Sequence, residues 1–348
     1  MRIVVAMSGG VDSSTVAGLL HEQGHEVIGV TLQLYDHGAA VSRKGACCAG
    51  QDIHDARRVA DHIGIAHYVI DAEARFREAV MKDFADSYAA GETPVPCVRC
   101  NQSVKFTDLL ALTADLGASH MATGHYVQRV DGPDGAELHR AVDPQRDQSW
   151  FLFATTQSQL DRSLFPLGGM PDKATVRAHA QRLGIQVADK ADSQDICFVP
   201  SGSYADVVAK LRPDAALPGE IVSESGQVLA VHDGIARYTV GQAKRLGLAT
   251  HDGEQRRVVL ALDPATRRVV VGPKREGTTT VRLREMNWLV PPAARRCTVK
   301  LRAREVPHGA VVSADGVVTL DAPALPAPGQ ACVLYDGSRV LGGGFISA

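Results

Sequence analysis

Residues 3–14 read Ile3-Val4-Val5-Ala6-Met7-Ser8-Gly9-Gly10-Val11-Asp12-Ser13-Ser14. The apolar run at 3–6 predicts a buried parallel strand, and the segment after Ser13 predicts the start of a helix. A Ser-Gly-Gly turn between a strand and a helix leaves backbone N–H groups unpaired at the helix N-terminus, where they attract an anion. Two adjacent glycines also let a phosphate approach the backbone closely. This stretch therefore predicts an α/β fold with a phosphate-binding loop after its first strand.

The loop is not the Walker loop of kinases and GTPases, because it contains no Gly-Lys-Ser/Thr. Its Ser-Gly-Gly-x-Asp-Ser pattern resembles the pyrophosphate loop of enzymes that split ATP into AMP and pyrophosphate to activate a carbonyl oxygen. The resemblance implies that Asp12 faces Mg²⁺ or the pyrophosphate. It also implies that the ATP phosphates lie against Ala6, Met7, Ser8, Gly9, Gly10, Val11, Asp12 and Ser13.

Length and cysteine usage set the outer bounds. A chain of 348 residues is too long for one typical core, so two or three domains are expected. Its start has no signal-peptide pattern, and no apolar run reaches the length of a membrane span. Seven cysteines without a secretion signal indicate a reducing compartment, with thiols used for chemistry or metal binding. We therefore expect a cytoplasmic protein that does not enter a membrane.

The first half of the chain alternates between strand and helix patterns, and the second half is mostly strand. Alternation of this kind predicts a doubly wound parallel sheet that binds ligands at the carboxyl ends of its strands. From residue 217 onward, short alternating strands separated by Asp-Gly and Asp-Pro turns predict small β domains. The predicted strands are 2–6, 26–34, 67–70 and 119–123, and the predicted helices are 14–23, 53–63, 74–89, 105–116, 173–183 and 204–211.

These patterns predict three domains. Residues 1–200 are expected to form an α/β catalytic domain of the pyrophosphate-loop type. Residues 201–272 are expected to form a small β-rich central domain that contacts a nucleic acid, and residues 273–348 a C-terminal β-barrel.

Positive charge is concentrated in one segment. The net charge is only −2, yet residues 237–304 hold 16 Lys and Arg against 5 Asp and Glu. A basic block in a nearly neutral protein is typical of a surface that binds a phosphate backbone. The alternative is a merely solvated strand surface, which the charge count alone leaves open.

Two cysteine segments form the second chemical feature. Cys97-Val98-Arg99-Cys100 lies in a stretch, 91–101, that the prolines predict to be a loop. A single CxxC fits a redox pair, half of a zinc site or iron–sulfur ligation. The second segment, near Cys197, reads Ser193-Gln194-Asp195-Ile196-Cys197-Phe198. Two separated thiols together with an ATP-activating loop indicate sulfur transfer.

The chain resembles the bacterial tRNA-specific 2-thiouridylase family almost from end to end. The segments that carry the resemblance are residues 7–14, Cys47-Cys48, Asp55-Ala56-Arg57, Cys100-Asn101, Ala122-Thr123-Gly124-His125-Tyr126, Asp147-Gln148-Ser149, Phe165-Pro166-Leu167-Gly168, residues 193–198, Val240-Gly241-Gln242 and Leu341-Gly342-Gly343-Gly344. Other pyrophosphate-loop families share only the first of these segments. The resemblance implies ATP-dependent 2-thiolation of the wobble uridine in tRNAs with Lys, Glu and Gln anticodons.

The resemblance also assigns roles to single residues. Leu32 would line the adenine pocket, and Gly124 would let the nucleotide pack against backbone. Cys197 would carry a persulfide loaded by a cysteine desulfurase through a sulfur-relay protein. Cys100 would cleave that persulfide and leave a Cys100–Cys197 disulfide. The implied tRNA contacts are Val95, Pro96, Cys97, Arg146, Asp147, Gln148, Arg302 and Ala303.

The chemistry of the reaction agrees with these roles. The C2 carbonyl of uridine is a poor electrophile, and adenylation of its oxygen makes AMP the leaving group. Mg²⁺ and the loop amides would neutralise charge on the departing pyrophosphate. A thiolate of low pKa, or a persulfide, is then the form in which a protein offers nucleophilic sulfur. The base must also leave its stack to reach the site.

Three residues depart from the family pattern. Cys97 stands where many relatives have Asp, so Cys97, Cys100 and Cys197 are alternative ligands of a [4Fe–4S] cluster with one open iron. The persulfide route and the cluster route therefore both remain open from the sequence. Ala243 replaces a basic residue of the family's Gly-Gln-Arg-Lys-Gly pattern, and Ala303 replaces a tyrosine of some relatives. Both changes put nearby tRNA contacts in doubt.

Overall fold

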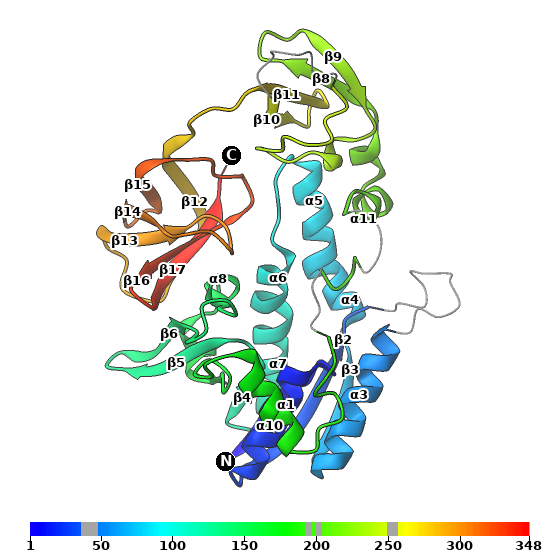
Figure 1. The fold of residues 1–348 in the computed structure, drawn as a ribbon, viewed down its shortest axis with the longest axis vertical. Helices are drawn as coiled ribbons and strands as arrows, with labels where there is room; N and C mark the ends of the chain where they lie inside the picture. Colours follow the sequence, from blue (N-terminus) through cyan, green and yellow to red (C-terminus); the bar gives the residue numbers. More distant parts are fainter. Residues whose placement is uncertain (36–47, 192–195, 200–203, 249–256, 348) are drawn as a thin grey trace.

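The computed structural model describes residues 1–35, 48–191, 196–199, 204–248 and 257–347. Cys47, the side chain of Cys48 and the Ser193–Asp195 part of the second cysteine segment lie outside the described residues. Figure 1 shows three parts along the long axis: an α/β part at the N-terminal end, a β-barrel beside its centre and a small β-rich part at the far end.

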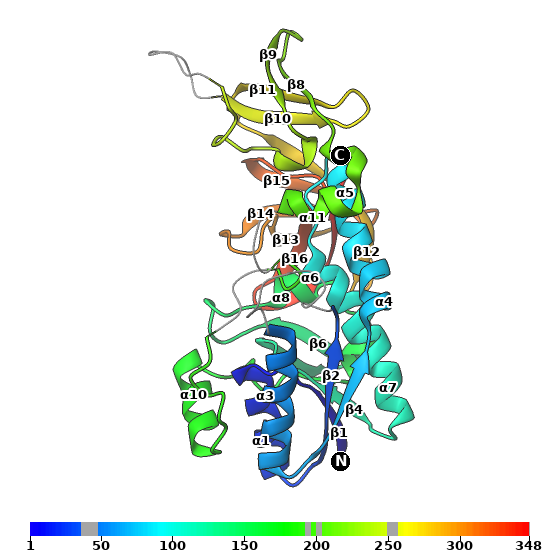
Figure 2. The same ribbon diagram turned by 90° about the vertical axis from the view of Figure 1, so that its right-hand side faces the viewer.

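The α/β part is built on a parallel sheet of five strands in the order β3-β2-β1-β4-β7. Ile3 and Val5 enter the core on one face of β1, and Val4 enters a second core on the other face, as alternation along a strand requires. Figure 2 shows α1, α3 and α10 on one side of the sheet and α7 on the other. The strands are β1 (Arg2–Ala6), β2 (Glu26–Gln33), β3 (Ala66–Asp71), β4 (His120–Ala122) and β7 (Ser163–Leu164), and the helices named are α1 (Val11–Glu22), α3 (Cys48–Ile63), α7 (Leu109–Asp115) and α10 (Lys173–Arg182).

Two long helical runs leave the sheet toward the other parts (Figure 1). The first consists of α4 (Glu73–Phe76), η1 (Arg77–Lys82) and α5 (Asp83–Ala89), and the second of α6 (Pro96–Arg99), η2 (Cys100–Asp108) and α7. Both η1 and η2 are wound as π-helices. The second run corrects the predicted loop at 91–101, because the helix begins at Pro96 and contains the whole CxxC segment. Proline suits the first helical turn, since the N–H it lacks would have no partner there.

The C-terminal part is a closed β-barrel of six strands, because β12 pairs with both β15 and β17. Its core contains Val299, Ala310, Leu334 and Leu341. A hairpin from the α/β part extends the same sheet, with His139 opposite Arg339. The sequence did not predict this hairpin. The bounds are β5 (Val127–Gly132), β6 (Gly135–Arg140), β12 (Thr278–Trp288), β13 (Arg295–Lys300), β14 (His308–Val312), β15 (Val317–Ala324), β16 (Ala331–Asp336) and β17 (Arg339–Ile346).

The small β-rich part, which lies between the α/β part and the barrel in the sequence, has a four-stranded sheet in the order β10-β11-β8-β9. Its helix α11 packs against α5, where the rings of Phe84 and Tyr204 lie 6.2 Å apart. In the described part of the chain, no helix has the length and apolar character needed to cross a bilayer. The elements are α11 (Tyr204–Leu211), η3 (Pro213–Ala216), β8 (Gly219–Ser223), β9 (Val228–His232), η4 (Ile235–Arg237), β10 (Arg257–Asp263) and β11 (Arg268–Pro273), and the short helices of the α/β part are α8 (Ser149–Leu152) and α9 (Gln157–Asp161).

The predicted fold class is confirmed: a parallel α/β domain is followed by a small β-rich domain and a closed barrel.

Candidate functional site

The loop between β1 and α1 has the geometry of an anion site. Gly9 has a φ of 73°, which only glycine adopts at low cost, and a Cβ there would lie 2.1 Å from the carbonyl oxygen of Asp52. Gly10 is the N-cap of α1 and has no side chain to cap the helix. The first N–H groups of α1 therefore keep no side-chain acceptor from the N-cap, so they remain suited to a phosphate.

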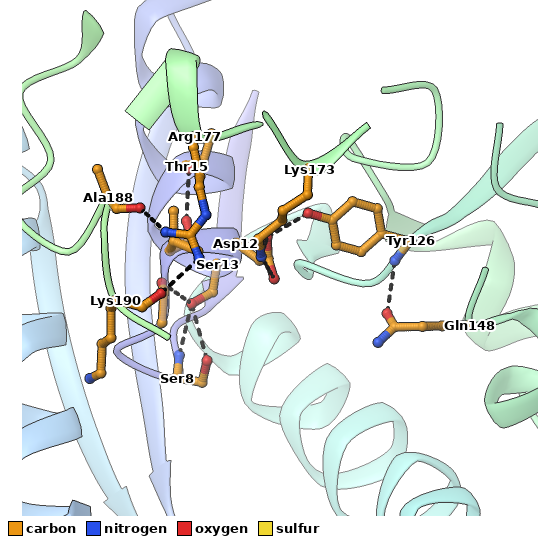
Figure 3. A network of polar contacts seen from close by, with 12 residues as sticks. Ser8, Asp12, Ser13, Thr15, Tyr126, Gln148, Lys173, Arg177, Ala188 and Lys190 are labelled. Atoms are coloured by element: carbon orange, nitrogen blue, oxygen red, sulfur yellow. Dashed lines mark hydrogen bonds and ion pairs between the residues drawn. The ribbon is translucent and has the colours of Figure 1, made fainter. Parts of the chain in front are cut away.

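Serine hydroxyls fix the shape of this loop. The Ser8 backbone N–H donates to Ser13 Oγ at 3.0 Å, and the hydroxyls of Ser8 and Ser13 lie 3.3 Å apart. Ser13 is buried, whereas Ser8 is exposed. Figure 3 shows these contacts at the base of α1. The Ser8 hydroxyl is thus held in place and still able to meet a ligand.

Asp12 is held by Lys173 and Tyr126, to neither of which the sequence analysis assigned a role. Both of its carboxylate oxygens accept from Lys173 Nζ at 2.7 Å, and Oδ1 also accepts from the Tyr126 hydroxyl at 2.6 Å (Figure 3). Lys173 is only 9% exposed and begins α10 after the N-cap Asp172. A positive charge is thereby fixed at the predicted phosphate site.

A second lysine supports the loop from the other side. Lys190 Nζ donates to the Gly9 carbonyl at 3.0 Å and to Asp52 and Asp55 at 2.6 Å. Burial lowers the pKa of Lys190, but the hydrogen bonds to the two aspartates outweigh it and raise that pKa above its ordinary value. Lys190 also borders a cavity of about 300 Å³ between α3 and the chain at 186–190. The Asp55 segment of the family pattern therefore acts through Lys190 on the loop.

The two remaining predicted nucleotide contacts lie near the loop. A Cβ on Gly124 would lie 2.9 Å from the backbone nitrogen of Ser13 and 3.0 Å from Asp12 Cβ. Gly124 therefore lets the chain after β4 pack against the start of α1, which accounts for a glycine here without a nucleotide. Leu32 lies near the carboxyl end of β2 and packs against two cores, the one that contains Val4 and the one that contains Cys100. Its role at an adenine pocket stays a prediction.

The structure brings Cys100 and Cys197 to one site. Cys100 is buried in a core that also contains Phe198, the residue after Cys197. Phe198 packs edge-on against Phe76 at 5.7 Å and Phe84 at 5.2 Å, which fixes the Cys197 segment beside α4 and α5. Cys97 and Cys197 are exposed, and neither is in a disulfide.

All three thiols have raised pKa values. Burial is the main cause for Cys97 and Cys100, and burial together with the two other thiols raises the pKa of Cys197 to about 12. The raised pKa values contradict the first of the two expected forms of nucleophilic sulfur, a thiolate of low pKa, and the second form, a persulfide, stays a prediction. The reason for the raised pKa values is physical: although Cys97 and Cys197 reach the surface, the protein packed around the three thiols disfavours their charged form, and the charge of Lys105 opposes that effect only in part.

One chain segment connects the phosphate loop with the cysteine site. Gly124 touches the start of α1, and the next residue, His125, is buried with its ring 6.2 Å from Phe106 on η2. Burial, together with Lys105 on η2, lowers the pKa of His125 to about 3, so its imidazole is neutral at physiological pH. Its Nδ1 shares a 2.8 Å hydrogen bond with Thr123 Oγ1. The segment after β4 therefore contacts both the phosphate loop and η2, the helix that begins at Cys100.

The metal hypotheses fit the site unequally. Mg²⁺ is commonly bound through one or two carboxylates together with substrate phosphates, and Asp12 supplies such a carboxylate at the loop. For a [4Fe–4S] cluster the fit is poor. Within residues that the structure describes, no group of three or more His, Cys, Asp or Glu side chains is arranged to hold a metal. Cys97, Cys100 and Cys197 are all in that part and are not brought together as ligands.

Several residues that were predicted to contact tRNA are buried or form hydrogen bonds within the protein. Val95 is 8% exposed and Pro96 is buried, so burial does not support side-chain contacts with tRNA there. Asp147 accepts from the backbone N–H groups of Ala141 and Ser149, and Gln148 Oε1 accepts from the Tyr126 N–H at 2.9 Å. These residues shape the turn beside the phosphate loop, while Arg146 is half-buried and already has a partner.

The basic segment is partly neutralised by pairing. Five of its described arginines form ion pairs with acidic residues: Arg237 with Asp206, Arg268 with Glu220, Arg275 with Glu224, Arg284 with Glu92, and Arg296 with Asp321. Lys244, Arg245 and Arg302 are exposed, and none of them has an acidic partner among the described residues. The charge count of the sequence thus overstates the free positive surface.

Two of the predicted tRNA-contacting loops lie side by side. A Cβ on Gly241, in the small β-rich part, would lie 4.0 Å from the guanidinium of Arg302 in the barrel. The guanidinium donates to the Leu325 carbonyl at 3.4 Å, and the half-buried Ala303 offers its own carbonyl to Lys300. Arg302 and Ala303 therefore face the junction of these two parts.

Arg99 of the CxxC segment connects the barrel with the helical run of α6 and η2, which carries Cys97 and Cys100 and is called the cysteine helix below. Arg99 forms a bidentate pair with Glu285 of β12, at 2.6 and 2.9 Å, and its guanidinium lies 4.1 Å from the centre of the Phe345 ring. Glu285 has a φ of 52°, which is unusual for a residue other than glycine. The barrel thus fixes the position of the helix that carries Cys97 and Cys100.

A parallel α/β sheet, a Ser-Gly-Gly loop and an adjacent lysine define a nucleotide-binding domain of the HUP class. A family model described as "tRNA methyl transferase HUP domain" matches residues 1–201. Models described as "tRNA methyl transferase PRC-barrel domain" and "Aminomethyltransferase beta-barrel domain" match residues 205–273 and 278–346.

Curated relatives identify the family more closely. The tRNA-specific 2-thiouridylase MnmA of Acidiphilium cryptum is 71% identical over 99% of this chain and 100% of its own length. Proteins of the same name from Gluconobacter oxydans and Rhodospirillum centenum are 64% and 60% identical, over 100% and 99% of this chain and 99% and 91% of their own lengths. The chain belongs to the tRNA-specific 2-thiouridylase family, which confirms the resemblance stated from the sequence.

Proposed function

We propose that this protein is a tRNA sulfurtransferase that uses ATP to convert the wobble uridine of tRNA to 2-thiouridine. The observation that carries the proposal is the continuity from the phosphate loop through Gly124 and His125 to the cysteine helix. An adenylated base held at the loop would lie beside the sulfur donor. The family's relatives, which are named for this activity, support the same reading.

The proposed reaction has two steps. In the first, the C2 oxygen of uridine attacks the α-phosphorus of ATP, and pyrophosphate leaves. In the second, the Cys100 thiolate attacks the inner sulfur of the Cys197 persulfide, which forms a Cys100–Cys197 disulfide and releases hydrosulfide. Hydrosulfide then attacks C2 and displaces AMP, with loss of one proton. A cysteine desulfurase or sulfur-relay protein would supply the next persulfide sulfur, once an external dithiol has reduced the disulfide.

Different residues at the loop would stabilise different parts of the negative charge of ATP in the first step. The α1 N-terminus and the hydroxyl of Ser8 would receive phosphate oxygens, and Lys173 would meet the pyrophosphate from beside Asp12. Asp12 would hold Mg²⁺, which supplies charge neutralisation on the leaving pyrophosphate when it is bound. Lys190 would act on the loop indirectly, by fixing the Gly9 carbonyl.

The direct test combines purified protein, unmodified tRNA, ATP, Mg²⁺ and a persulfide donor. We expect AMP, pyrophosphate and 2-thiouridine to form in equal amounts, with the nucleoside measured by mass spectrometry after digestion. Binding of tRNA and ATP without pyrophosphate release would instead indicate a non-catalytic RNA-binding or sulfur-carrier protein.

We propose Arg302 as a phosphate contact on the barrel side of the tRNA surface. Arg302→Ala should weaken tRNA binding at every sequence and reduce the slope of log affinity against log salt by about 1, because one exposed arginine without an acidic partner in the described chain is lost. Filter binding at several salt concentrations measures this slope.

Arg296→Ala is the matched control, since it removes the same charge from the same barrel. Arg296 is exposed but forms a bidentate pair with Asp321, at 3.0 and 2.6 Å. Its loss should leave the slope nearly unchanged. Equal slopes in both variants would argue that Arg302 does not contact the backbone of tRNA.

We also propose that the domain boundaries lie near residues 200 and 272, in support of which the three family models divide the chain at similar positions. We also propose a cytoplasmic location, because the proposed substrate is a tRNA that serves translation there.

A further inference from the structure

The π-helical winding of η2 places Lys105 on the face of Cys100. In a π-helix, hydrogen bonds join residues five apart, and the N–H of Leu109 donates to the carbonyl of Val104 in this way. In an α-helix, residues five apart are rotated by about 140° around the axis. The wider π-turn reduces that rotation, so Cys100 and Lys105 stand one turn apart on nearly the same face. Phe106, the residue after Lys105, packs against His125.

Lys105 acts electrostatically on every thiol of the site. Burial raises the pKa of Cys97, Cys100 and Cys197, and in all three the positive charge of Lys105 opposes that rise. His125 is neutral, so it adds no charge of its own to this face. Lys105 is half-buried, and no carboxylate of the described residues lies within ion-pair distance of it. A half-buried lysine without an acidic partner is available to an anion formed during the reaction.

The other lysines near the site are engaged elsewhere. Lys173 is paired with Asp12, and Lys190 with Asp52 and Asp55. Both contact the phosphate loop or the start of α1, whereas Lys105 lies on η2 with Cys100. The charges needed for adenylation and for sulfur transfer are thus supplied by separate residues.

We propose that Lys105 is a catalytic residue of sulfur transfer, whose ammonium group stabilises the negative sulfur atoms of that step. The inference rests on the proposed function and deepens it. The Cys100 thiolate forms its bond to the inner sulfur of the Cys197 persulfide while the bond to the outer sulfur breaks. The electron pair of that bond leaves with hydrosulfide, and the ammonium group faces the negative charge before and after the transfer.

Thiol reactivity tests this role without ATP or tRNA. The protein is treated with a small excess of iodoacetamide, and alkylation of Cys197 and Cys97 is followed by peptide mass spectrometry. The total amount of each cysteine peptide, measured after complete alkylation of the unfolded protein, is the reference. We expect Lys105→Met to slow alkylation of Cys197 by about fivefold, because one positive charge beside a thiolate is lost. Lys105→Arg, which keeps the charge, should restore most of the rate.

Lys82→Met is the matched control, because Lys82 lies on the neighbouring π-helical turn but is exposed and paired with Glu78 at 2.8 Å. It should change neither alkylation nor thiolation. In the full reaction, Lys105→Met should lower the rate of thiolation by about tenfold or more while pyrophosphate release persists. Circular dichroism of each variant confirms that it is folded.

Two results would overturn the proposal. Unchanged alkylation in folded Lys105→Met would show that the ammonium group does not act on the thiols. Loss of pyrophosphate release in parallel with thiolation would assign Lys105 to the nucleotide instead. If the wild-type protein never thiolates tRNA, the proposed function fails, yet the alkylation ratio still measures whether Lys105 acts on the thiols.

Discussion

Asp12→Ala is expected to lower tRNA-dependent AMP formation by about 10² to 10³, the effect of removing one preorganised charge partner from a transition state. We expect two causes for the loss. The carboxylate proposed to hold Mg²⁺ disappears, and Lys173 loses the partner that holds its ammonium group at 2.7 Å from both oxygens. Affinity for tRNA should stay nearly unchanged, because the basic surface lies in the other two parts of the chain. Pyrophosphate release and filter binding measure the two effects separately.

Unfolding must be distinguished from this loss of activity. Lys173 is nearly buried, so Asp12→Ala leaves an ammonium group without its anion, which destabilises a folded protein. Asp12→Asn keeps the shape and an acceptor for Lys173 and Tyr126, and should be folded yet equally inactive. Asp131→Ala, at an exposed aspartate of the β5–β6 hairpin, is the control and should remain active. Normal turnover of Asp12→Asn would contradict the assignment of this loop to the ATP phosphates.

Local pattern was enough to predict the α/β part. Buried parallel strands read as continuous apolar runs, and the turn after β1 requires glycines, so strand, loop and α1 followed from one short segment. The sequence pattern was misleading at the prolines, because proline is common both in loops and in the first turn of a helix. Pro94 and Pro96 suggested a loop, but Pro96 occupies the first turn of α6, where proline is favourable.

Long-range contacts account for the other omissions. Lys173 and Lys190 meet the loop through α10 and the segment after it, more than 150 residues from Asp12, and no spacing rule connects them. The raised thiol pKa values arise because α6, η2 and the Cys197 segment meet in one core. The pairing of Arg268 and Arg296 in the basic segment likewise depends on acids from other strands. The lysine contacts, the raised pKa values and the arginine pairs all depend on contacts that form only in the folded chain.

The cysteine variants separate the two sulfur routes. Under the persulfide route, Cys100→Ser and Cys197→Ser should each abolish 2-thiouridine formation, because Cys197 carries the sulfur and Cys100 releases it. Pyrophosphate release should persist in both variants, since adenylation precedes sulfur transfer. Mass spectrometry of the nucleoside and a pyrophosphate assay on the same samples give both results.

Cys97→Asp distinguishes the routes most sharply. Cys97 is exposed at the start of α6, so Asp fits the position, and its carboxylate would face the charge of Lys105. Under the persulfide route we expect at least half of the wild-type thiolation rate. Under the cluster route, loss of any one of the three cysteines should remove iron and thiolation together. The arrangement of the described residues, in which these thiols are not gathered as metal ligands, favours the first outcome. A brown, iron-loaded wild-type protein prepared without oxygen, alongside a colourless and inactive Cys97→Asp, would establish the second.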